Sequence, residues 1–405
     1  MYIVKKILAI IIFLWPIPTF SQNNDLSVAV YSELSSKSTL GSQNNLKVSD
    51  KNKVGFNLNY STKNLSSQLN FNYSASNKLD LGNSYIDYKK GIATVVFGKV
   101  DRIWSFSEKS SLILSANSVP FTTFAAKLEN NFSLNSPSST TNWSLEIING
   151  TTKNSYNGKS SMLFGARAII SPTKRLSFEL LQTSQWGGES RSLNLSSLDA
   201  IFLGNTNSGY NADINKMAGF GISYMIPLNE KNLRIYGQAV GEDEAGNLPS
   251  CYSWMTGFEL STLKIKFPTT VAIEIIDTRV DTSSHGYCGP NTMYNNNAYK
   301  YINYDTVMGV PIDSEGKSYE LFGESIISHN LSMKYSVKLA TINDNNVLFH
   351  RLSTKKNRGS LASLGILWKR NKLKVGGTVS YQDLSLDKTN IENGAGFNLF
   401  SSFTF

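Results

Sequence analysis

The stretch LSMKYSVKLA, residues Leu331–Ala340, alternates apolar side chains with small or charged ones. Successive residues of a β-strand point to opposite faces, so this period of two places Tyr335 on one face and Lys334 on the other. The same alternation recurs over Val54–Tyr60. Helical periodicity is nearly absent, and the one short helix expected, residues 196–203, lies between serine caps and a glycine stop. The sequence therefore predicts an all-β protein.

The connections between the alternating segments point to a membrane barrel. About eighteen candidate strands are separated by gaps that are alternately short and long, the pattern of an antiparallel up-and-down transmembrane barrel with short periplasmic turns and long extracellular loops. We expect Tyr335 and Leu58 to face lipid, Lys334 and Asn57 to face the lumen, and the short helix to plug the lumen in part. The expected strands are 26–36, 53–60, 65–74, 80–88, 91–100, 122–133, 141–149, 160–170, 174–185, 218–228, 232–241, 253–263, 268–279, 319–328, 331–340, 361–369, 372–381 and 395–405.

The N-terminus has the form of an export signal. It reads MYIVKKILAIIIFLWPIPTFSQ, with Lys5 and Lys6 before a short apolar run and small residues before the expected cleavage point after Ser21. The apolar run is too short to cross about 30 Å of hydrocarbon, which argues against an N-terminal anchor. We therefore expect residues 1–21 to be a cleaved signal peptide and residues 22–405 to form the barrel.

The C-terminus agrees with a barrel. Phe397, Leu399, Phe403 and the final residue Phe405 lie on one strand face. A terminal phenylalanine on such a strand resembles the signal read by the outer-membrane barrel assembly machinery. We therefore expect an integral protein of the outer membrane of a Gram-negative bacterium, in contact with outer-membrane lipid and most simply a monomer.

Composition excludes several other classes. Hydrophobic residues make up 40% of the chain and charged residues only 17%, which excludes intrinsic disorder. The net charge of +9 could suit an anionic partner. No Lys/Arg-dense stretch interleaved with aromatic residues accompanies that charge, so we expect no nucleic-acid partner. No later apolar run is long enough for a transmembrane helix.

Three separated motifs resemble the capsule assembly Wzi family of outer-membrane proteins. The first runs from Asp101 to Trp104 and is followed by Ser111–Asn117; the second is Gln185-Trp186-Gly187-Gly188-Glu189; the third is the acidic run Gly241–Gly246, followed by Leu248-Pro249-Ser250. The resemblance covers about residues 90–330. It implies an eighteen-stranded barrel that binds capsular polysaccharide or exopolysaccharide and holds it at the cell surface.

The acidic run admits three interpretations. If strand geometry persists, Glu242 and Glu244 share one face and Asp243 lies opposite. Nearby carboxylates repel unless cations lie beside them, so one interpretation is a lumenal salt-bridge network that braces the loops. The others are direct contact with sugar and a glycosidase-like acid pair. The expected bracing network comprises Asp101, Arg102, Arg191, Glu242, Asp243 and Glu244.

Aromatic residues of the expected loops suit a lectin-like surface. Flat rings stack on apolar sugar faces, while carboxylates and amides take the hydroxyl groups. We therefore expect Trp186, Glu189, Tyr294 and Tyr299 to contact polysaccharide. The alternative for the 287–304 segment is a packed lid, and Trp254 and Trp143 suit the aromatic girdle of a barrel.

Other chemistry finds little support. The histidines His285, His329 and His350 lack metal-ligand spacing, so we expect no metal site and no cofactor. Without a catalytic arrangement we expect a binding protein and not an enzyme. A porin or sugar-specific channel is the alternative function, and it requires an open lumen.

The two cysteines, Cys251 and Cys288, both fall on the extracellular side of this topology. Export places them in an oxidising compartment. A disulfide between them would enclose about 38 residues, which is worth roughly 3–4 kcal/mol by loop entropy. Two free thiols are the alternative.

Overall fold

The structure is a computed structural model, and it describes residues 25–41, 48–74, 79–133, 140–153, 160–188, 214–245, 248–262, 266–281, 288–296 and 299–405. A nineteen-stranded antiparallel sheet closes on itself where β1 pairs with β21. The segments β4 and β5 both pair with β3 and share one position in the wall, so the barrel has eighteen positions. The predicted eighteen-stranded antiparallel barrel is therefore confirmed.

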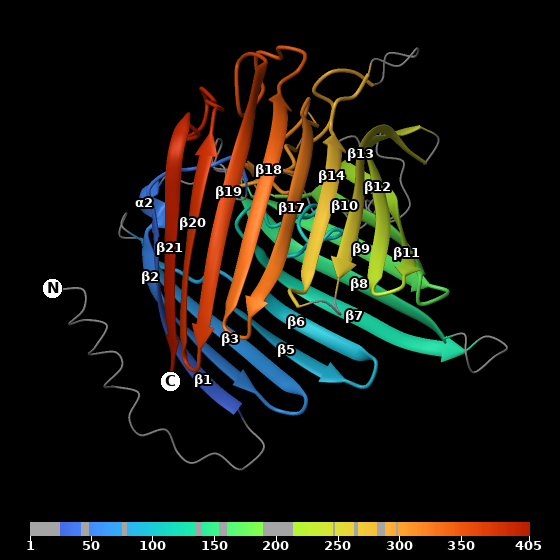
Figure 1. Cartoon of the computed structure of the whole chain (residues 1–405). Coiled ribbons are helices and arrows are strands. Elements are labelled where there is room, and N and C mark those ends of the chain that lie inside the picture. Colours follow the sequence, from blue (N-terminus) through green and yellow to red (C-terminus); the bar gives the residue numbers. More distant parts are fainter. Residues whose placement is uncertain are drawn as a thin grey trace.

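Each strand pairs with its neighbours in sequence, the up-and-down order (Figure 1). The first half of the wall is β1 (Asp25–Ser35), β2 (Lys53–Ser61), β3 (Leu65–Ser74), β4 (Leu79–Asp80), β5 (Tyr85–Lys90), β6 (Ala93–Lys99), β7 (Thr122–Ser133), β8 (Thr140–Lys153), β9 (Ser160–Ser171) and β10 (Leu176–Trp186). The second half is β11 (Asn215–Leu228), β12 (Lys231–Ala245), β13 (Leu248–Thr262), β14 (Thr269–Asp277), β17 (Lys317–Ser328), β18 (Leu331–Ile342), β19 (Asn357–Arg370), β20 (Leu373–Gln382) and β21 (Gly394–Thr404).

Three small elements lie in the connections. They are the one-turn helix α2 (Val48–Lys51) and the two strands of a short hairpin, β15 (Ile302–Asn303) and β16 (Thr306–Val307). The helix expected over residues 196–203 lies outside the described residues. Within the described part of the chain, no helix is long and apolar enough to cross a membrane.

Long and short connections lie at opposite ends of the barrel. We call the end that carries connections such as 100–121, 278–316 and 343–356 the loop end, and the other end, where the chain terminates at Phe405, the turn end (Figure 1). One expected loop, 242–252, is instead a hairpin. Strands β12 and β13 stay paired up to Ala245 and Leu248, so the acidic run continues strand β12.

Strand β18 shows how the side chains of a wall strand separate into an apolar outer face and an inner face that carries polar residues. In β18, Val337 and Leu339 are 50% and 56% exposed, whereas Ser336, Lys338 and Ala340 are buried. Tyr335 lies on the face of Val337, and Lys334 lies on the inner face and pairs with Glu324 at 3.5 Å. An exposed apolar exterior is what a lipid environment requires of a barrel wall.

This register predicts the effect of charge on the two faces. Tyr335→Arg would place a guanidinium in hydrocarbon. It should lower the free energy of unfolding of the barrel by about 2–4 kcal/mol, the cost of an arginine near the midplane. Lys334→Gln on the inner face should have a much smaller effect, since it loses only an exposed ion pair. Urea titration of folding into lipid vesicles measures both changes. A larger effect of Lys334→Gln would contradict the register.

Candidate functional site

The interior of the barrel at the loop end is filled by its own connections. Trp104, Leu112 and Ile113 from the connection 100–121 are at most 1% exposed, and Met293 and Tyr294 from 278–316 are fully buried. These residues belong to one apolar cluster, to which further connections add Leu40, Leu352, Leu386 and Ile391. A barrel of this size with nothing inside would leave an aqueous channel. Here the connections form a packed core, which we call the lumenal plug.

The wall holds the connection 100–121 through hydrogen bonds to its backbone. Arg167 Nη2 donates to the carbonyl oxygen of Ser105 at 2.8 Å, and Arg234 Nη1 donates to that of Phe106 at 2.6 Å. Gln238 uses both ends of its amide: Nε2 donates to the Trp104 carbonyl at 2.6 Å, and Oε1 accepts from Leu112 N at 2.8 Å. A loop removed from water needs partners for its backbone groups, and these side chains supply them.

Carboxylates on the same wall fix these donors. Glu179 accepts from Arg167 Nε at 2.9 Å and from Gln238 Nε2 at 3.0 Å. Glu259 pairs with Arg234. Arg167 and Arg234 therefore each have a carboxylate beside them, without which their burial would be costly.

Arg102 and Trp104 of the first predicted motif meet one wall residue. Glu146 accepts from Arg102 Nε at 3.0 Å and from Trp104 Nε1 at 3.2 Å. The Trp104 ring lies so close to β9 that a Cβ at Gly165 would come within 2.8 Å of it. Asp101 lies outside this group and accepts instead from Asn83 Nδ2 at 2.6 Å.

Glu242 reaches into the plug from the β12–β13 hairpin. Its two carboxylate oxygens accept from the backbone N–H groups of Tyr294 and of Asn296, the latter at 3.0 Å. We expected arginines to hold this carboxylate, but the structure gives backbone donors because the 278–316 connection folds back against it. The side chains of Asp243 and Glu244, the other two members of the acidic run, lie outside the described part.

Tyr252 is the last aromatic residue of the hairpin whose ring points outward, and it pairs with Gly241. Glu242 follows Gly241 and therefore lies one residue further toward the loop end. Complete burial raises the pKa of Glu242 to about 8, although the hydrogen bonds from the 293–296 backbone oppose the rise. This carboxyl group acts as a tether for the plug.

Tyr294 is not the outward sugar contact that we expected. Its side chain is fully buried and stacks on Tyr301 with 5.9 Å between ring centroids, and its hydroxyl donates to the Leu112 carbonyl at 2.7 Å. Residues 293–294 and 301–302 belong to the plug, so this part of the tyrosine-rich segment matches the packed-lid alternative. The physical reason is the large lumen, which needs bulky side chains to fill it.

Tyr299 lies beside the second motif, at the residue that follows Trp186 in the chain. Tyr299 Oη donates to the carbonyl oxygen of Gly187 at 2.7 Å, and Trp186 packs against Phe164 and Ile214. Both side chains are half-buried. Trp186 Nε1 has no hydrogen-bond partner among the described residues. Glu189 and Arg191 lie outside the described residues.

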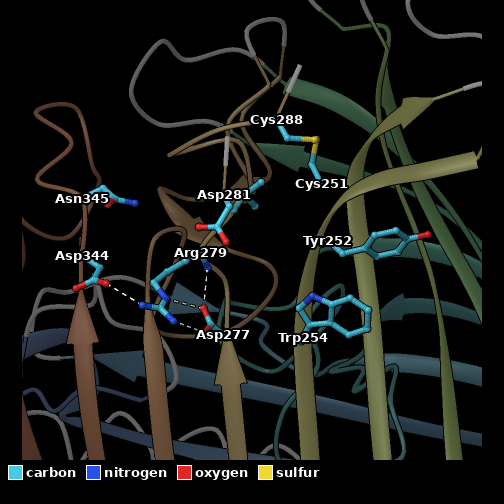
Figure 2. Close-up of a pocket in the computed structure, with 10 residues that line it drawn as sticks. Cys251, Tyr252, Trp254, Asp277, Arg279, Asp281, Cys288, Asp344 and Asn345 are labelled. Atoms are coloured by element: carbon cyan, nitrogen blue, oxygen red, sulfur yellow. Dashed lines mark hydrogen bonds and ion pairs between the residues drawn. A yellow bond between two sulfur atoms is a disulfide. The ribbon is translucent and has the colours of Figure 1, made fainter. Parts of the chain in front are cut away.

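Cys251 and Cys288 form a disulfide with 5.3 Å between their Cα atoms. It fastens the β12–β13 hairpin to the connection 278–316. A cleft of about 450 Å³ lies beside it, lined by residues of the hairpin, of the 277–281 segment and of the connection 343–356 (Figure 2). We call this the rim cleft. Metal-binding clusters of three or more His, Cys, Asp or Glu side chains are not present within the described ranges.

The sequence interpretation missed the wall side chains that hold the plug. They are Glu146, Arg167, Glu179, Gln238 and Glu259, each surrounded in sequence by apolar strand residues. A charged residue at an inward position of a lipid-facing strand is the signal that could have found them. The loop groups that Glu146, Arg167 and Gln238 hold could not have been found, because those lie in a connection distant in sequence.

The connection 343–356 is held by a buried histidine. His350 Nδ1 accepts from Leu352 N at 3.2 Å and from Ser353 N at 3.4 Å, and its Nε2 faces the Ser314 carbonyl oxygen at 2.9 Å. Burial lowers the pKa of His350, although nearby Asp313 opposes the shift. This geometry requires the neutral ring with its proton on Nε2.

Comparison with known proteins identifies the family. The sequence profile of the family described as capsule assembly protein Wzi matches residues 20–397. The chain belongs to the Wzi family. A stretch of 123 residues is 34% identical to a Klebsiella pneumoniae protein described as an uncharacterized 55.8 kDa protein in the cps region. That stretch covers 30% of this chain and 24% of the Klebsiella protein.

Solved structures share the barrel. The Wzi protein of Escherichia coli, described as a carbohydrate-binding β-barrel involved in group 1 capsule assembly, superposes with a TM-score of 0.77 and 21% identity. The match covers 93% of this chain and 84% of that one. OprD of Pseudomonas aeruginosa has a TM-score of 0.53 at 11% identity over 95% and 96% of the chains. OccAB2 of Acinetobacter baumannii gives 0.54 at 10% identity over 96% and 99%. At these identities the likeness concerns the fold, which places the chain among outer-membrane barrels.

Gln238 offers a direct test of the plug. Gln238→Leu would remove three hydrogen bonds and leave the buried N–H group of Leu112 without a partner, at about 1–3 kcal/mol. We expect the connection 100–121 to loosen and the ion conductance of the barrel in planar bilayers to rise. Gln68→Leu is the matched control, because Gln68 donates to Asn83 away from the plug. Unchanged conductance in Gln238→Leu would contradict the clamp.

His350 predicts a local pH dependence. Because its folded pKa lies below its unfolded value, the stability it contributes is present above about pH 6.5 and is lost as the pH falls through the folded pKa. As the pH is lowered from about 7.5 to about 5.5, the ratio of the measured to the intrinsic hydrogen-exchange rate of residues 343–356 should therefore increase. His350→Gln should abolish this dependence, whereas His329→Gln, at an exposed turn-end position, should retain it. A dependence that survives His350→Gln would refute the assignment.

Proposed function

We propose that this Wzi-family chain binds capsular polysaccharide or exopolysaccharide at its loop end and helps to attach or assemble it at the cell surface. The observation that carries the proposal is the lumenal plug. Side chains such as Trp104, Ile113 and Tyr294 pack inside the lumen at the loop end, and the connections that carry them form a surface there. A long polymer needs many shallow contacts, which such a surface can offer.

The family supports the same function. The Escherichia coli relative is described as carbohydrate-binding and as involved in group 1 capsule assembly. The Klebsiella relative is encoded in a cps region. We transfer binding of a surface polysaccharide to this chain and leave the identity of the sugar open.

Trp186, Glu189 and Tyr299 are our candidates for polymer contact. The hydrogen bond between Tyr299 and Gly187 holds two of them in one place. An indole ring gives a flat apolar face, and a carboxylate can accept from sugar hydroxyls. Tyr294 acts through the plug, which supports this surface from below.

Further parts of the proposal concern biogenesis and placement. We propose that residues 1–21 are cleaved on export, that the loop end is extracellular, and that Phe405 engages the barrel assembly machinery. We propose a monomer in contact with outer-membrane lipid that needs no cofactor and catalyses no reaction. A porin or sugar-specific channel is the competing function, and the filled lumen argues against it.

Retention of polymer on cells tests the function. Deleting the gene should leave the total amount of polymer unchanged and shift it from the cell surface to the medium. A Trp186→Ala, Tyr299→Ala double variant should do the same while it still folds and runs heat-modifiably on a gel. Trp368→Ala, near the turn end of β19, is the control and should retain polymer as wild type does. Equal retention by wild type, deletion and double variant would reject the proposal.

A further inference from the structure

The rim cleft opens on the outer face of the wall and borders the lumenal plug, to whose apolar cluster its lining residues Cys251 and Val280 belong. Trp254 on β13 is 54% exposed, whereas its neighbours Ser253 and Met255 are buried inward. Its register partner on β14 is Asp277, so both side chains leave the wall on the same side. The cleft therefore lies where the lipid-facing band ends and the loop end begins.

One side of the cleft is aromatic. The ring centroids of Tyr252 and Trp254 lie 5.6 Å apart, and Tyr252 in turn contacts Phe220 at 6.3 Å. Figure 2 shows both rings beside the charged groups of β14 and the segment that follows it. An exposed indole next to polar groups combines an apolar face with hydrogen-bonding partners at its edge.

The other side is polar and fixed in place. Arg279 binds both oxygens of Asp277, at 2.8 Å through Nε and 2.6 Å through Nη2, and its Nη1 donates to Asp344 at 2.9 Å. A guanidinium has five N–H donors, so these three bonds leave two for a ligand as far as the described residues show. Asp281 is exposed at the same place and points its carboxylate into the cleft (Figure 2).

The cleft is preorganised by covalent and ionic links. The Cys251–Cys288 disulfide joins its two sides. Asp344 is also bound by Lys356, and hydrogen bonds from Lys356 and Arg279 hold the pKa of Asp344 below its usual value. A site whose groups are already held in place loses less free energy to ordering when it binds.

We infer that the rim cleft is a saccharide-binding subsite in which one pyranose ring stacks on Trp254 while its hydroxyls donate to Asp281 and accept from the free N–H groups of Arg279. Its volume of about 450 Å³ lies within the range of small-ligand sites. Three carboxylates line it against one guanidinium, which favours neutral or amino sugars over uronates and phosphates. The inference rests on the proposed polysaccharide binding. The sugar can come from the polymer or from a glycolipid of the surrounding leaflet.

Binding by the purified full-length chain tests the subsite. The probes are oligosaccharides cut from the surface polymer of the source strain, used before and after carboxyl reduction, and vesicles containing that strain's outer-leaflet glycolipid. Trp254→Leu and Asp281→Ala should each weaken binding about tenfold, and carboxyl reduction should not weaken it. Phe258→Leu is the matched control, because Phe258 is 44% exposed on the same face of the same strand and does not line the cleft.

The outcomes separate the two proposals. If the two cleft variants bind the oligosaccharides more weakly than wild type, the cleft belongs to the polymer. If they bind only the glycolipid vesicles more weakly, the cleft belongs to the glycolipid. Both results support the subsite. If wild type binds and both cleft variants bind equally well, the subsite is wrong and the proposed function stands. Loss of binding on carboxyl reduction also overturns the preference for uncharged sugars. If wild type binds neither probe, both proposals fail.

Discussion

The structure depends on how a wide barrel fills its own lumen. Eighteen tilted strands enclose a lumen that wall side chains alone do not fill, and this chain fills it with connections from its loop end. A connection inside the barrel loses contact with water, so its backbone groups need fixed partners. Arg167, Arg234 and Gln238 provide those partners from the wall. The wall and the plug therefore form one unit.

Charge inside the barrel follows from the same constraint. The wall residues that reach the plug are long and polar, and a buried charge without a partner would be costly. Glu146, Glu179 and Glu259 each face an arginine, so the cations that hold the loop backbone are themselves held. Glu242 has no such cation within hydrogen-bonding distance among the described residues. It binds two backbone amides, and burial shifts its pKa upward.

A rigid plug has a consequence for function. The fixed connections 278–316 and 343–356 also build the rim, where the disulfide and the Asp277–Arg279–Asp344 group hold the cleft open. A surface that keeps its shape can present rings and carboxylates to a polymer without ordering them first. Filling of the lumen and display of a binding face are therefore two results of the same packing.

The sequence by itself determined the barrel: period-two alternation fixed the strands and their faces, and alternating gap lengths fixed their antiparallel order. The Wzi motifs marked Arg102, Trp104 and Trp186 as important. Only the tertiary structure decided which loop residues face solvent. Tyr294 and Tyr299 belong to the same short tyrosine-rich segment, yet Tyr294 lies inside the plug, because burial of a loop side chain depends on contacts with other connections, here with Leu112, more than a hundred residues away. Such contacts leave no periodicity in the sequence, whereas a strand is a local pattern and does.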